Sequence, residues 1–158
     1  MKHKTRTKAL SWLLSLAMVL SLIPAFSLTA YAAETWSENQ TISATQTIDG
    51  GVTVTANITL TIAEGATLTV NGGINAGSNT LTVAGEGNLV VTGKDGDSST
   101  EATDTTGGDG IIGNIVVNGA NVTVSGGDSH WRVDACPGGN GVTGNVTVKS
   151  GLFNISPA

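Results

Sequence analysis

The sequence predicts an all-β fold, a parallel β-helix of about four to five coils that follows an N-terminal signal peptide. Two observations predict it. Short segments of alternating apolar and polar residues recur along the chain, which indicates strands with one buried face. These segments also repeat at fixed offsets, with glycine at the corners between them, which is typical of a solenoid that climbs one coil per repeat.

The first pair of repeats spans residues 60–72 (LTIAEGATLTVNG) and 81–93 (LTVAGEGNLVVTG), at an offset of 21 residues. Each copy contains two short alternations separated by a corner that contains glycine. The offset aligns these residues: Leu60 with Leu81, Ile62 with Val83, Leu68 with Leu89, Val70 with Val91, and Gly72 with Gly93.

The second pair spans residues 107–125 (GGDGIIGNIVVNGANVTVS) and 138–156 (GGNGVTGNVTVKSGLFNIS), at an offset of 31 residues. The longer offset needs only one lengthened corner, which a solenoid tolerates because the ladder of strands stays intact. We therefore expect four successive coils, each with a short apolar lead and two strands. The leads are Val52, Ile74, Ile111 and Val142.

Aliphatic and aromatic residues at alternate strand positions are expected to point into the solenoid, where each contributes roughly 1.5–3 kcal/mol by leaving water. They are Leu60, Ile62, Leu68, Val70, Leu81, Val83, Leu89, Val91, Ile115, Val117, Val122, Val124, Val146, Val148, Phe153 and Ile155. Threonine dominates the outward positions between them, for example Thr59, Thr61, Thr80 and Thr82.

Residues 1–32 have the anatomy of a secretory signal peptide: a basic start, an apolar run over residues 9–28, and the small-x-small site Ala30-Tyr31-Ala32. We expect residues 33–48 to form a lead or cap, in which Trp36 and Ile42 cover the first coil. The β-helix domain then spans residues 49–158. We expect that the chain is a fragment, or that a further coil or a partner chain follows the last strand.

Removal of residues 1–32 leaves three Lys or Arg residues against twelve Asp and Glu residues, a formal net charge of −9. Such a surface disfavours nucleic acid and anionic lipid but attracts cations. After cleavage we expect no membrane association. The single cysteine, Cys136, excludes an internal disulfide.

Two long corners interrupt the rhythm, at residues 94–110 and 126–141, and they should emerge side by side from one face of the solenoid. The first is acidic, and a carboxylate-rich turn can supply the oxygen ligands that Ca²⁺ requires. A weak calcium site and a solvated acidic loop both remain open. The candidate ligands are Asp95, Asp97, Glu101, Asp104 and Asp109.

The second corner carries Asp128, His130, Trp131 and Arg132. An exposed Trp131 could stack on a sugar ring while its neighbours bond hydroxyl or carboxylate groups, or it could fold down onto the side of the solenoid. Neighbours in sequence do not make a catalytic triad, because a triad is defined by geometry. We therefore expect ligand binding here and no enzyme activity.

The TLTV strands and the GGDGI-IGNIVV and GGNGV-TGNVTV units, together with the secretory leader, resemble secreted right-handed parallel β-helix proteins. They look most like the carbohydrate-binding β-helix domains on the surfaces of Gram-positive, clostridia-like bacteria. The resemblance covers roughly residues 50–156, and it implies a surface location, acidic plant polysaccharides as ligands, and calcium. The related polysaccharide lyases use calcium-binding aspartates and an arginine base.

These features predict a non-catalytic, secreted or surface-displayed module that binds an extracellular glycan or mediates adhesion. A structural spacer, or a piece of a larger surface protein, is the alternative. A polysaccharide lyase or hydrolase is disfavoured, since Arg132 has no aspartate cluster that the sequence places beside it.

Overall fold

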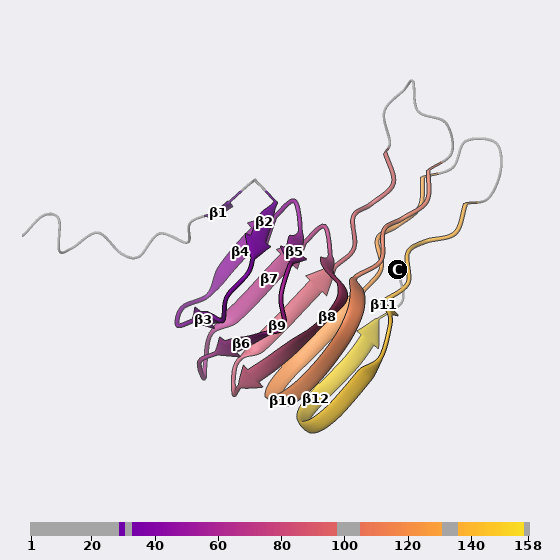
Figure 1. Ribbon diagram of the computed structural model, residues 1–158. Coiled ribbons are helices and arrows are strands. Elements are labelled where there is room, and N and C mark those ends of the chain that lie inside the picture. The colour runs from indigo at the N-terminus through magenta and orange to yellow at the C-terminus, as the bar shows by residue number, and fades with distance from the viewer. Residues whose placement is uncertain (1–28, 31–32, 98–104, 131–135, 157–158) are drawn as a thin grey trace, which may run out of the picture.

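A computed structural model describes residues 29–30, 33–97, 105–130 and 136–156. In these residues the protein is all-β, and its named strands pair in parallel to form a solenoid (Figure 1). The predicted parallel β-helix is therefore confirmed. Residues 1–28 and 31–32 of the expected signal peptide lie outside the described ranges, so that expectation stays a prediction.

The strands stack in three ladders, one on each face of the solenoid. The first face contains β2 (Glu34–Trp36), β5 (Val52–Val54), the start of β8 (Ile74–Gly85), the start of β10 (Ile111–Ser125) and β11 (Val142–Thr143). The second contains β3 (Gln40–Ile42), β6 (Ile58–Ile62), the end of β8, the middle of β10 and the start of β12 (Val146–Ser156). The third contains β1 (Thr29–Ala30), β4 (Gln46–Asp49), β7 (Thr67–Asn71), β9 (Asn88–Thr92) and the ends of β10 and β12.

The segment expected as a lead is itself a coil. Residues 34–49 supply β2, β3 and β4, each paired with the equivalent strand of the following coil. Trp36 and Ile42 are both buried and belong to the hydrophobic core. The first coil thus starts at Glu34, and the coils that begin at Val52, Ile74, Ile111 and Val142 follow it.

One predicted alignment is wrong by two residues. On the second face Ile58 pairs with Leu81 and Leu60 with Val83, whereas the 21-residue offset places Leu60 on Leu81. The cause lies in the corners: residues 63–66 separate β6 from β7, but only residues 86–87 separate β8 from β9. A shift of two residues keeps the same side chains facing inward, so the alternation does not reveal it. On the third face the predicted pairing of Leu68 with Leu89 is confirmed.

The predicted core is buried through the fourth coil. All twelve inward positions from Leu60 to Val124 are buried, with at most 1% of each residue exposed. In the fifth coil the side chains keep the same register, since Val146 pairs with Ile115 and Ile155 with Val124. They are nevertheless exposed: Val146 by 38%, Val148 by 48% and Ile155 by 60%, while Phe153 is half-buried.

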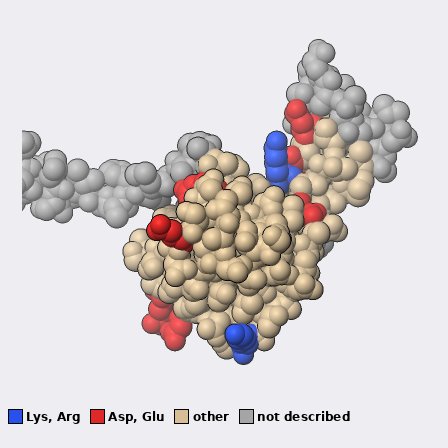
Figure 2. Space-filling view, in the orientation of Figure 1, with Lys and Arg blue, Asp and Glu red and all other residues tan. Residues whose placement is uncertain are grey.

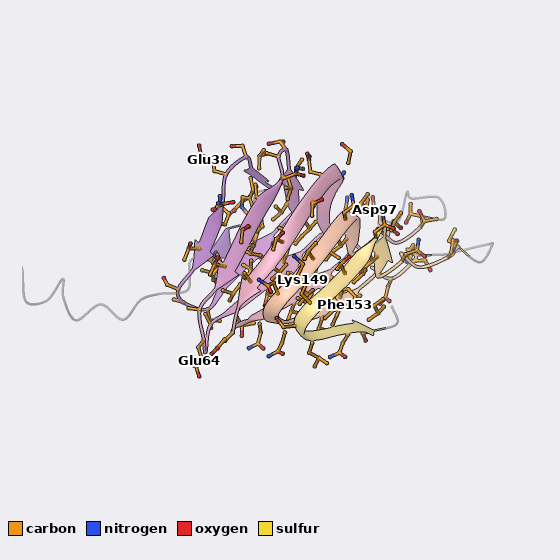
Figure 3. The ribbon with its side chains drawn as sticks, turned by 60° about the horizontal axis from the view of Figure 1, so that its bottom comes forward. Glu38, Glu64, Asp97, Lys149 and Phe153 are labelled. Carbon is orange, nitrogen blue, oxygen red and sulfur yellow. The ribbon has the colours of Figure 1, made fainter. Side chains whose placement is uncertain are left out.

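The expectation of burial is therefore wrong for the last coil. Its physical reason is the position of β12, which pairs with β10 on one side and with no named strand of the described residues on the other. Figure 3 shows Phe153 and Lys149 on this coil at the end of the stack.

No helix in the described ranges is long and apolar enough to cross a membrane.

Candidate functional site

The two long corners leave the solenoid at the same place, between the end of the third face and the start of the first. One follows β9 and the other follows the end of β10. They run together away from the body as a single projection (Figure 1). This confirms the prediction that they emerge side by side.

Backbone hydrogen bonds join the lower parts of the corners into what we call the stalk, defined by residues 93–97, 105–110, 126–130 and 136–141. Three bonds cross it in series: the Gly108 N–H donates to the Lys94 carbonyl (2.6 Å), Gly127 donates to Gly108 (2.8 Å), and Gly139 donates to Gly127 (2.9 Å). Further out, Thr105 and His130 exchange two backbone hydrogen bonds of 2.8 and 2.9 Å in an antiparallel bridge. The stalk is thus held by backbone bonds along its length.

Only glycine allows these segments to approach so closely. A Cβ atom on Gly107 or Gly139 would overlap the backbone of Gly127 or Gly108, and one on Gly127 would overlap the Lys94 carbonyl. Such an overlap with backbone cannot be relieved by a side-chain rotation. The GG pairs that mark the repeats therefore serve to pack the stalk.

The structure places two of the four predicted ligand-binding residues. Asp128 is exposed and His130 is half-buried, both on the outer part of the stalk. The Asp128 carbonyl accepts a hydrogen bond from the Gly96 N–H (2.8 Å), so this segment is tied to the first corner. Trp131 and Arg132 lie outside the described residues, directly after His130.

The predicted calcium ligands are not gathered in the described part of the chain. Asp95 accepts a hydrogen bond from the Asp128 N–H at 3.0 Å, and Asp97 lies nearby with its carbonyl bonded to the Thr105 hydroxyl at 3.2 Å. Among the described His, Cys, Asp and Glu residues, no group of three or more could hold a metal ion. Glu101 and Asp104 lie outside the described ranges, and calcium binding stays a prediction.

Asp109, the fifth candidate ligand, instead connects the fourth and fifth coils. Its two carboxylate oxygens accept hydrogen bonds from the Thr143 hydroxyl (2.6 Å) and the Asn140 N–H (2.8 Å). The hydrogen bond from the Thr143 hydroxyl lowers the pKa of Asp109, and the hydrogen bonds from Asn140 lower it further. Partial burial raises the pKa, but by less than these hydrogen bonds lower it. This carboxylate therefore stays charged and ties Asn140 and Thr143 to the coil below.

The sequence analysis missed a groove at the foot of the stalk. One hollow of about 480 Å³ is lined by Gly50, Asn71, Gly72, Thr92, Gly93, Lys94 and Asp95. A second hollow of about 130 Å³ shares Gly50 and Gly72 and reaches Thr53, Asn75 and Asp109. We call the two together the corner groove. The signal that could have found it is the polar residue followed by glycine at the ends of β4, β7, β9 and β10.

The glycines of the corner groove are required by the backbone. Gly50, Gly51, Gly72 and Gly73 all have positive φ angles, between 81° and 105°, which residues with a side chain rarely adopt. A Cβ on Gly51 would also lie 2.6 Å from the Gly72 carbonyl oxygen. The groove therefore presents a bare glycine backbone. It is flanked by side chains with hydroxyl, amide, ammonium and carboxylate groups and, in the second hollow, by apolar residues that include the exposed Ile112.

Charged side chains are sparse over the body of the solenoid. Basic (blue) and acidic (red) side chains lie close together where the projection leaves the body (Figure 2).

The chain matches no protein-family model, no curated protein and no solved structure.

Proposed function

We propose that this chain is a non-catalytic, secreted or surface-displayed module that binds an extracellular polysaccharide or mediates adhesion. The observation that carries the proposal is the stalk, because it brings two corners far apart in sequence into one projection. That projection holds Asp128 and His130, and the segment with Trp131 and Arg132 continues from it. Trp and Arg recur at the centres of binding surfaces, where they combine large contact area with directional hydrogen bonds.

The resemblance to carbohydrate-binding β-helix domains supports the same proposal and suggests the surface of a Gram-positive-like bacterium as the location. The net negative charge of the chain without residues 1–32 determines which charge a glycan ligand can carry. A direct contact with an acidic polysaccharide would be opposed by the net charge of −9, unless a cation such as Ca²⁺ bridges the two surfaces. We therefore expect a calcium requirement only for an acidic glycan.

The test is retention of the secreted chain on immobilised glycans, with wild type, Trp131→Ala and the control Lys149→Ala compared with and without a chelator. Lys149 is exposed on β12, away from the stalk. We expect weak retention of wild type and the control, and its loss with Trp131→Ala. Incubation with each glycan should release no unsaturated sugar; release would show a lyase instead. Retention on no glycan would contradict the proposal.

A structural spacer is the second candidate, and the uncovered fifth coil favours it. The exposed Val146, Val148 and Ile155 repeat the inward pattern of the buried coils. This edge suits a further coil or a partner chain with the same alternation. A spacer is expected to show no retention on any glycan and to have a reading frame that continues past Ala158.

A further inference from the structure

The corner groove follows the axis of the solenoid and crosses three coils. Gly50 lies at the end of the first coil, Asn71 and Gly72 at the end of the second, and Thr92 and Gly93 at the end of the third. Successive coils are spaced by about 4.8 Å, as strands in any sheet are, so the groove spans roughly 10 Å between its first and third coils. Its long direction is therefore the direction in which the fold repeats.

A ladder of polar side chains runs beside the groove, one from each of the first four coils. Its two middle members, Asn71 and Thr92, line the groove itself. Asp49 pairs with Asn71, Asn71 with Thr92, and Thr92 with Ser125 in the strand register. Two hydrogen bonds link its members, from Asn71 Nδ2 to Asp49 Oδ1 (2.6 Å) and from the Ser125 hydroxyl to Thr92 Oγ1 (3.4 Å). The ladder offers amide, hydroxyl and carboxylate groups at a constant spacing. A ligand that uses it must repeat its own polar groups along a line.

The charges at the groove exclude a strongly anionic ligand. Among the described residues that line it, Lys94 is the one cation, against Asp95 and Asp109, and the adjoining Asp49 adds a third carboxylate. Asp109 and Asp95 already accept hydrogen bonds from the protein, yet their charge remains. An uncharged ligand rich in hydroxyl groups avoids this repulsion and can still bond to the ammonium, amide and hydroxyl groups.

We infer that the corner groove binds a linear, uncharged polysaccharide, which lies along the solenoid axis with its hydroxyl groups on the polar ladder and a ring face against the bare glycine backbone. The inference rests on the proposed function. It adds a second contact region, at the foot of the stalk, and it specifies uncharged polysaccharides as the class of ligand. A chain held in the groove would run directly past the base of the projection that carries His130.

The experiment uses the secreted chain, with cellohexaose, xylohexaose and mannohexaose as uncharged probes and hexagalacturonate as the acidic probe. Binding is measured by calorimetry and by the amide signals of Gly50, Gly72 and Gly93 in ¹⁵N-labelled protein. The groove variant is Asn71→Ala with Thr92→Ala. Its matched control is Thr41→Ala with Thr61→Ala, an exposed pair on adjacent coils of the second face.

We expect at least one uncharged hexasaccharide to shift the three glycine signals. The groove variant should bind it roughly tenfold more weakly, because two hydrogen-bonding groups are lost, and the control should bind as wild type does. Circular dichroism establishes that both variants are folded.

Three results would overturn the inference, and they differ in what else they overturn. If binding survives in the groove variant but is lost with Trp131→Ala, the groove is not the binding site, whereas the proposed function is still supported. Binding of hexagalacturonate alone would overturn the ligand class. Binding of no saccharide by wild type would overturn the proposed function together with the groove.

Discussion

The first and last coils have the same alternating pattern but differ in burial. Ile48 of the first coil and Ile155 of the last coil belong to one ladder, which runs from Ile48 through Val70, Val91 and Val124 to Ile155. Ile48 is 2% exposed and Ile155 is 60% exposed. At the first coil β1 pairs with β4 on its outer side and Trp36 is buried, whereas at the last coil β12 has no such neighbour among the described strands.

The difference shows that alternation fixes the direction of a side chain, while burial depends on the coil stacked above it. In a solenoid each coil contacts only its neighbours, so the stability of a coil is set locally. An uncovered edge also leaves a row of backbone N–H and C=O groups without strand partners. We therefore expect the two ends to respond very differently to equivalent substitutions.

The largest contrast is expected between Leu89→Asp and Ile155→Asp. Leu89 is fully buried in the third coil, so an aspartate there would be a buried, unpaired carboxylate and should cost more than about 4 kcal/mol. At the exposed Ile155 the same change should cost no more than about 1 kcal/mol. Urea denaturation of a protein that comprises residues 33–158, followed by circular dichroism, measures both.

Thr82→Asp serves as the control for this experiment, because Thr82 lies on an outward position of β8 and should tolerate the change within about 1 kcal/mol. Equal destabilisation by Leu89→Asp and Thr82→Asp would contradict the inward register. Equal destabilisation by Leu89→Asp and Ile155→Asp would show that the last coil is covered in solution.

A smaller contrast is expected between the aromatic residues of the two end coils. Trp36→Ala should destabilise the protein by about 3–5 kcal/mol, since the indole is 4% exposed and packs in the core. Phe153→Ala should cost about 1 kcal/mol, because the ring is half-buried on the uncovered coil. The same denaturation experiment compares them. A cost for Phe153→Ala as large as that for Trp36→Ala would mean that a partner covers the last coil.

The smallest effect concerns pH and the attachment of the fifth coil. The pKa of Asp109 is lower in the folded protein than its ordinary value of 3.8. Its contribution to stability is therefore present above that value and is lost as the pH falls through the lower, folded-state pKa. Amide exchange of Asn140 and Thr143 should accelerate relative to the first coil on going from about pH 5 to about pH 3. The control variant Asp109→Asn has no titrating group at this position, so the relative acceleration of exchange should disappear in it. If the acceleration persists in this variant, another group causes it.

Much of the fold could be predicted from the sequence because its signal is local. The alternation at Leu68, Val70, Leu89 and Val91 identifies both strands and their buried face, and the offset of 21 residues aligns them. The register on the second face could not be fixed in the same way. The paired residues are 22 apart on the first face (Val52 with Ile74), 23 apart on the second (Ile58 with Leu81) and 21 apart on the third (Leu68 with Leu89), because the corners of the two coils differ in length.

The candidate site was predictable only in part. The sequence indicates that the two corners share one side of the solenoid, but the stalk depends on contacts between residues such as Lys94, Gly108, Gly127 and Gly139 that no short motif expresses. The corner groove was missed for a related reason. Five of its lining residues are glycines, which have no side chain that a motif could express. Asn71 and Thr92 resemble ordinary residues at the ends of strands until the register places them side by side.

The glycine packing of the stalk also bears on how this protein can change over generations. Substitutions at Gly107, Gly127 or Gly139 would disturb the stalk, because a Cβ atom at any of these positions would overlap neighbouring backbone. By contrast, the exposed stalk residues Lys94, Asp95 and Asp128 do not belong to the hydrophobic core, so their side chains can change without altering it. The stalk thus combines glycine positions that must be conserved for packing with neighbouring positions that are free to diverge.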